Sequence, residues 1–63
     1  MPGPTDTLPE FRRKEIFAAL VGAQDRGVAV AQSRRQVADQ FGLTPDQVAE
    51  IERDGADNDW PPL

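Results

Sequence analysis

Apolar residues recur at helical spacing in three separate stretches of the chain. In the first stretch, Ile16, Ala19, Leu20 and Ala23 occupy the i, i+3, i+4 and i+7 positions of a buried helical stripe. Phe17 and Val21 widen this stripe, with Phe11 a turn and a half before Phe17, and the two later sets are Val37, Ala38 and Phe41, then Val48, Ala49 and Ile51. A helix cannot bury such a face alone, and no candidate strand has a pairing partner. The pattern therefore predicts an all-α three-helix bundle.

Three segments have the sequence form of a helix start. In residues 7–10, 33–36 and 44–47, a Thr or Ser is followed three residues later by Glu or Gln, as in a capping box. In the third segment Pro45 occupies the first helical position, which its fixed φ favours. We therefore expect Thr7, Ser33 and Thr44 to act as N-caps.

Glycines mark where the helices are expected to end. Gly27, Gly42 and Gly55 each follow an apolar-periodic stretch, and glycine readily adopts the left-handed conformation just past a helix. The predicted helices span about residues 8–26, 34–41 and 45–54. The apolar linker 28–32 is expected to be either an extended connector or an early turn of the second helix.

The segments outside the bundle contain most of the prolines. Residues 1–7 are predicted to form a flexible N-terminal lead, and residues 55–63 an extended, acidic C-terminal tail. Within this tail, Trp60 precedes Pro61 and Pro62, which favour an extended chain. Trp60 and Leu63 have two interpretations, either closing one end of a small core or anchoring a partner protein.

A helix-turn-helix constellation lies at residues 38–51. Ala38 is small where one helix crosses another, Gly42 permits a sharp turn, and Leu43, Val48 and Ile51 fill the angle between the helices. The sequence from Phe41 to Glu52 resembles region 4 of bacterial sigma factors and related small helix-turn-helix proteins. The resemblance covers about 20 of the 63 residues. It implies a role in transcription, with the outward residues of the third predicted helix as the contact surface.

The composition excludes several kinds of chemistry. The chain has 63 residues and a net charge of −4, with no Cys and no His. It therefore has no disulfide, thiolate zinc site, cysteine nucleophile or imidazole base. The glycine spacing matches neither a P-loop nor a dinucleotide fingerprint. We expect a non-enzymatic protein without catalytic residues, metal, cofactor or small-molecule substrate. Because no membrane span or signal peptide is recognisable, a cytoplasmic location is expected.

The charge distribution leaves three hypotheses for function. Basic residues cluster at 12–14 and 34–35, whereas the third predicted helix contains Asp46, Glu50 and Glu52. These carboxylates oppose phosphate contact, so a protein partner, with transcription machinery as the implied class, is favoured over DNA. The alternatives are a dimeric DNA-binding regulator and a small phage-type inhibitor whose acidic surface mimics phosphate. The candidate contact residues are Arg12, Arg13, Arg34, Arg35, Thr44, Asp46, Gln47, Glu50, Arg53, Trp60 and Leu63.

Overall fold

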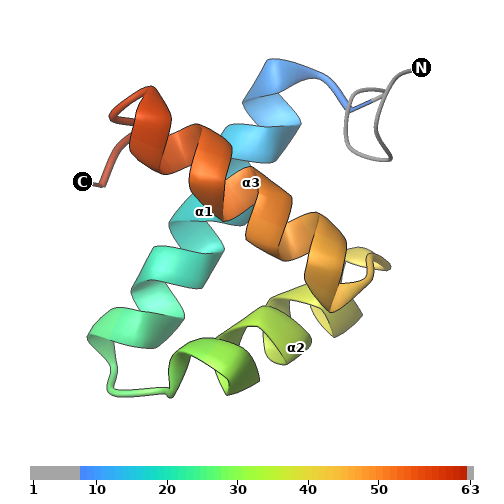
Figure 1. Ribbon diagram of the computed structural model, residues 1–63, viewed down its shortest axis with the longest axis vertical. Coiled ribbons are helices and arrows are strands. Elements are labelled where there is room, and N and C mark those ends of the chain that lie inside the picture. Colours follow the sequence, from blue (N-terminus) through green and yellow to red (C-terminus); the bar gives the residue numbers. More distant parts are fainter. Residues whose placement is uncertain (1–7, 63) are drawn as a thin grey trace.

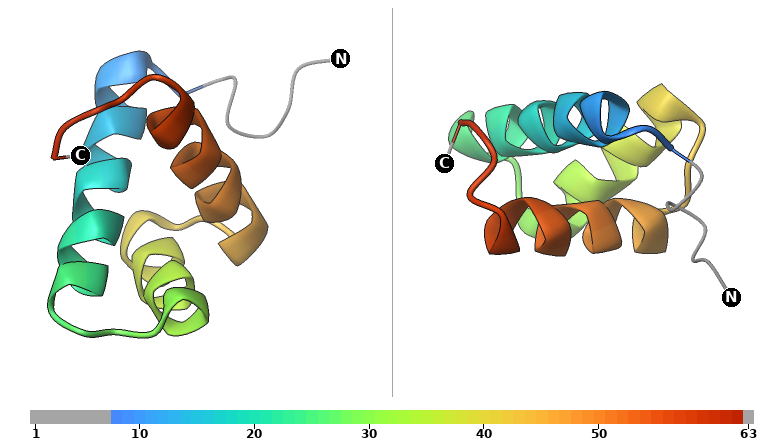
Figure 2. Two further views of the ribbon diagram at one scale, coloured as in Figure 1. Left: turned by 60° about the vertical axis from the view of Figure 1, so that its left-hand side comes forward. Right: turned by 90° about the horizontal axis from the view of Figure 1, so that it is seen from above.

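Three helices pack around one core. The computed structural model describes residues 8–62, in which α1 spans Glu10–Asp25, α2 spans Val30–Phe41 and α3 spans Pro45–Asp57 (Figure 1). Each helix contacts both of the others. Seen from above, α1 and α3 run along opposite sides of the molecule (Figure 2). This arrangement confirms the predicted all-α three-helix bundle, and the described residues contain no strand.

The core forms where the three inward faces meet. Leu20, Val48 and Ile51 are completely buried, one from α1 and two from α3. The remaining buried apolar residues are Ile16, Phe17, Ala23, Val37, Ala38 and Trp60. The predicted stripe of α1 is therefore confirmed at Ile16, Leu20 and Ala23, with Ala19 half-buried beside it.

The start of α1 differs from the prediction. Pro9 occupies the N-cap position and no side chain caps the helix, while Thr7 lies outside the described residues. Phe11, which the sequence suggested as a neighbour of the buried stripe, is 73% exposed. Phe11 precedes Phe17 by six positions, which places the two side chains about 120° apart around a helix, so they do not share one face. Gly27, at φ +92°, follows α1 as predicted.

The start of α2 corrects the prediction for Ser33. The helix begins at Val30, so of the two interpretations of residues 28–32 the early helical turn is right from residue 30 onward. Ser33 lies inside the helix and is fully buried, and its hydroxyl donates to the Val30 carbonyl at 2.7 Å. It therefore does not cap α2. No Gly or Pro occurs in residues 28–32 to stop the helix from extending upstream of Ser33.

The turn between α2 and α3 confirms the sharp turn predicted at Gly42. Gly42 adopts φ +70°, and the Leu43 amide donates to the Ala38 carbonyl at 2.8 Å. Thr44 forms a complete capping box: its hydroxyl accepts from the Gln47 amide at 3.2 Å, and its own amide donates to Gln47 Oε1 at 2.8 Å. Pro45 then begins α3, because its fixed φ suits a first helical position.

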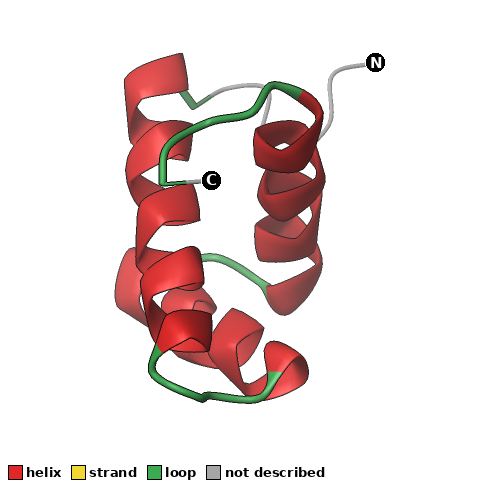
Figure 3. Ribbon diagram, turned by 90° about the vertical axis from the view of Figure 1, so that its left-hand side faces the viewer, coloured by secondary structure: helices red, strands yellow, loops and turns green. Residues whose placement is uncertain are grey.

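The C-terminal end corrects two predictions. The third helix continues through Gly55 to Asp57, so Gly55 is a buried helical residue and not a left-handed stop. The residues after Asp57 turn back towards α1 instead of forming an extended tail (Figure 3). Trp60 is 6% exposed, and its amide donates to the Gly55 carbonyl at 3.0 Å. Its ring packs edge-on against Phe17, with 6.0 Å between the ring centroids.

Candidate macromolecular interface

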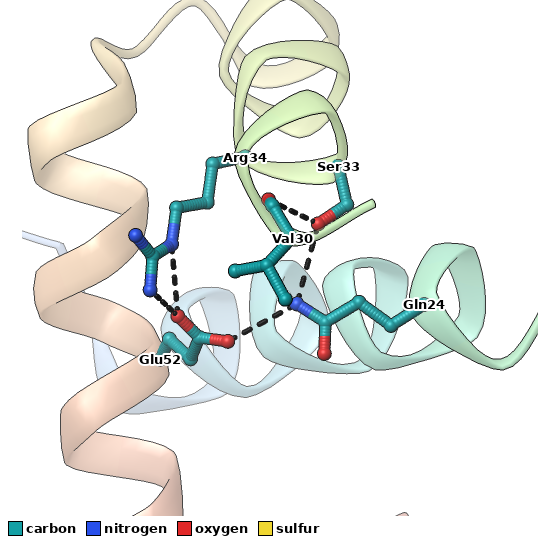
Figure 4. Close-up of polar contacts among 5 residues, drawn as sticks. All are labelled: Gln24, Val30, Ser33, Arg34 and Glu52. Atoms are coloured by element: carbon teal, nitrogen blue, oxygen red, sulfur yellow. Dashed lines mark hydrogen bonds and ion pairs between the residues drawn. The ribbon is translucent and has the colours of Figure 1, made fainter. Parts of the chain in front are cut away.

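A polar network joins all three helices and includes Arg34, one of the predicted contact residues. Arg34 donates from Nε and Nη2 to Glu52 Oε1, at 3.0 and 2.6 Å (Figure 4). Gln24 Nε2 donates to the other Glu52 oxygen at 3.1 Å and to the Ser33 hydroxyl at 3.2 Å. The Arg34 and Glu52 charges are therefore paired with each other across α2 and α3, at a position where the two side chains remain 37% and 24% exposed. Charge-assisted hydrogen bonds of this kind are stronger than neutral ones and favour one arrangement of the helices.

The arginines at the start of α1 also contact the protein itself. Arg13 lies 3.7 Å from Asp54, and its guanidinium carbon lies 5.9 Å from the centre of the Trp60 ring. Arg12 pairs with Glu15 at 2.6 Å and stacks over Phe41 at 5.4 Å. The Arg13 side chain is 23% exposed. Each member of the predicted basic cluster at residues 12–14 therefore has an acidic partner within the chain, which partly neutralises the cluster.

The charges without an ion pair are mainly acidic. Lys14 pairs with Glu10 at 3.7 Å, which completes the four ion pairs seen within residues 8–62. In the same described segment, the cations with no ion pair are Arg26, Arg35 and Arg53. The exposed aspartates with no ion pair there are Asp25, Asp39, Asp46, Asp57 and Asp59. The accessible electrostatic character is thus more acidic than the basic clusters in the sequence suggest.

The outer face of α3 brings several of the predicted contact residues together. Asp46, Glu50, Arg53 and Asp57 recur every three or four residues along the helix, on the side opposite the buried Val48, Ile51 and Gly55. Ala49 lies among them and adds little bulk. We call Asp46, Ala49, Glu50, Arg53 and Asp57 the α3 outer face. It contains three carboxylates and one guanidinium.

The other predicted contact residues have different surroundings. Thr44 and Gln47 hydrogen-bond each other in the capping box, so their polar groups are already partly satisfied. Arg35 is exposed on α2, apart from the α3 outer face. Trp60 is buried in the core and cannot anchor a partner in this conformation, and Leu63 lies outside the described residues.

Two features of the surface were missed from the sequence. Asp57 was assigned to the tail because Gly55 was interpreted as a helix end, although the 46, 50, 53, 57 spacing was visible as a helical series. The position of Phe11 close to Phe17 along the chain suggests a place beside the buried stripe, yet Phe11 is 73% exposed. Counting its rotation around the helix would have placed it outward.

The described residues show no enclosed site for a small ligand. Residues 8–62 contain neither a pocket nor a group of three or more acidic residues placed to hold a metal ion. Of the helices in this part of the chain, none is both long and apolar enough to cross a membrane. Comparisons with protein-family models, curated proteins and solved structures find no match. The α3 outer face is the surface where several predicted contact residues lie together with their charges accessible.

Proposed function

We propose that this protein is a non-enzymatic binding module of helix-turn-helix type that acts in transcription by contacting a protein partner through the α3 outer face. The resemblance of residues 41–52 to sigma factor region 4 supports transcription machinery as the class of partner. The acidic character of the face favours a partner surface that presents Lys or Arg. Complementary charge steers such partners together and sets their register.

The engagement of the arginines within the bundle is the observation that favours a protein over DNA. Specific and non-specific DNA binding both depend on cations that neutralise backbone phosphates. Arg34 is bound to Glu52, and Arg13 lies between Asp54 and Trp60. Turning either guanidinium towards a phosphate would remove a contact within the fold. The helix that would enter the major groove carries Asp46 and Glu50 on its outer side, where they would repel phosphates.

The test compares two variants that change the net charge equally at different places. D46K/E50K reverses the charge of the α3 outer face, whereas D25K/D39K reverses two exposed aspartates at the end of α1 and on α2. The immobilised wild-type protein should capture RNA polymerase subunits from host lysate. We expect D46K/E50K to lose this capture and D25K/D39K to keep it. Thermal melting of each variant checks that both remain folded.

Two results would contradict the proposal. Failure of the wild-type protein to capture any transcription component would remove the assigned partner class, and equal loss in both variants would remove the α3 outer face as the contact surface. A fluorescence-anisotropy titration with duplex DNA at low salt tests the alternative that the protein binds DNA directly. Binding at micromolar protein that weakens steeply with added salt would favour direct DNA recognition.

A further inference from the structure

The outer side of α1 presents a second surface that the proposed function does not use. Phe11, Lys14, Glu15 and Ala18 are all exposed and recur at the i, i+3, i+4 and i+7 positions of one helical face. We call these four residues the α1 outer face. Phe11 is 73% exposed, which leaves an aromatic ring in water on a helix whose opposite side is packed into the core.

No element within residues 8–62 covers the α1 outer face. The side of α1 that packs against the other helices contains Ile16, Phe17, Leu20 and Ala23. In the right-hand view of Figure 2, α1 forms one side of the molecule and α3 the other. A partner bound to the α1 outer face would therefore leave the α3 outer face accessible.

The α1 outer face is complementary to the same face of a second, antiparallel copy of the chain. Along the helix it reads large apolar, cation, anion, small apolar. We propose that two copies of the chain pair through antiparallel α1 helices, with a twofold axis passing between positions 14 and 15. In this register Phe11 packs over Ala18 of the second copy, and Lys14 faces Glu15 of the second copy. Every contact then occurs twice, as in an isologous dimer.

Size and charge both favour a second copy as the occupant. Ala18 leaves room for the Phe11 ring at the 8–10 Å separation of packed helices. The charges of Lys14 and Glu15 already have neighbours in their own chain, Glu10 at 3.7 Å and Arg12 at 2.6 Å. These exposed pairs contribute little individually, so they can be shared with a second chain at small cost. The face spans two helical turns, so we expect a weak, reversible dimer of the kind formed by small interfaces.

Charge reversal with a mixed sample tests the pairing and its register. K14E places carboxylates at both 14 and 15, and E15K places amines at both, so each variant alone meets like charge across the twofold axis. Sedimentation equilibrium from micromolar to millimolar protein should show a reversible wild-type dimer and monomeric single variants. An equimolar mixture of K14E and E15K should dimerise again, because every facing pair is then opposite in charge.

Two further variants keep the test informative if a single variant loses stability. The double variant K14E/E15K exchanges the charges and should dimerise as the wild type does. F11A should weaken the dimer by about tenfold or more, as for a central aromatic contact, without lowering the melting temperature of the monomer. A wild-type protein that stays monomeric to millimolar concentration would overturn the proposal. A mixture no more associated than its components would overturn the register.

Discussion

The two ends of α3 are determined in different ways. At its start, Gly42, Thr44, Pro45 and Gln47 form the turn and the capping box within six consecutive residues. At its end, a glycine that looked like a stop is buried inside the helix. The sequence pattern succeeds at the first end because every group involved is local.

Packing from elsewhere in the chain determines the second end. A Cβ atom at position 55 would overlap the Phe17 ring, so Gly55 is needed for the approach of α1 to α3. Trp60 also packs edge-on against Phe17, and its amide donates to the Gly55 carbonyl. The start of α3 is thus determined by a few neighbouring residues, whereas its end depends on residues of α1 and of the segment after α3.

Replacement of Trp60 should produce the largest effect. W60A removes a buried indole, the edge-on contact with Phe17 and the surface under Arg13, for a loss of about 3–5 kcal/mol in the free energy of unfolding. That loss approaches the total stability of a domain of this size. We expect the variant to be largely unfolded by circular dichroism at room temperature.

Phe11 offers a control for this substitution, because its aromatic ring is exposed whereas that of Trp60 is buried. F11A removes an aromatic ring that is 73% exposed and should change the free energy of unfolding by less than about 0.5 kcal/mol. A W60A variant that melts like F11A would show that the segment after α3 does not close the core in solution.

The same contrast explains which parts of the fold were predictable. Ser33 and Thr44 begin the same kind of sequence pattern, but only Thr44 caps a helix. Thr44 follows Gly42, whose left-handed conformation ends α2, and precedes Pro45, which is favoured at a first helical position. No Gly or Pro occurs in the five residues directly before Ser33, so the helix extends upstream to Val30 and the Ser33 hydroxyl is buried beside Gln24. A capping pattern therefore predicts a start where neighbouring residues also interrupt the helix.

The position of the candidate site could be predicted from the sequence, but the accessibility of the charged groups around it could not. The outward spacing on α3 follows from helical periodicity, so Asp46, Glu50 and Arg53 could be grouped from the sequence. The pairing of Arg34 with Glu52 joins different helices and depends on how those helices cross. Composition and local clusters give no account of such pairs, and for this reason the basic clusters looked more accessible than they are.

Substitution of Gly55 should have the next largest effect. G55A places a methyl group against the Phe17 ring and should destabilise the protein by about 2–3 kcal/mol through overpacking. G22A is the matched control, because a Cβ atom there meets nothing closer than Arg26 Nη1 at 3.7 Å. It should stabilise α1 by about 0.5–1 kcal/mol through helix propensity alone. Urea unfolding measures both, and stabilisation by G55A would show that α1 and α3 do not approach this closely.

At the local end of α3, the cost of changing Gly42 should come mainly from the backbone. A Cβ atom at Gly42 meets no atom within 4 Å, so there is room for the first side-chain carbon. G42V should still lose about 1–2 kcal/mol, because a β-branched residue is strained at φ +70°. Asn tolerates this conformation, so G42N should retain most of the stability. Equal melting temperatures for the wild type and G42V would place the turn elsewhere.

The capping box should give the smallest effect and the most local one. T44A removes the oxygen that accepts from the Gln47 amide at 3.2 Å and should lower the free energy of unfolding by about 1 kcal/mol. T44S keeps that oxygen and should stay close to the wild type. Hydrogen exchange of the Gln47 amide should be faster in T44A than in the wild type. The Trp60 amide donates to the Gly55 carbonyl at the far end of the helix, so its exchange rate should change only as far as the global stability changes. If T44A instead exposed the Trp60 amide selectively, the two ends of α3 would be coupled, and the start of the helix could not be treated as an independent local unit.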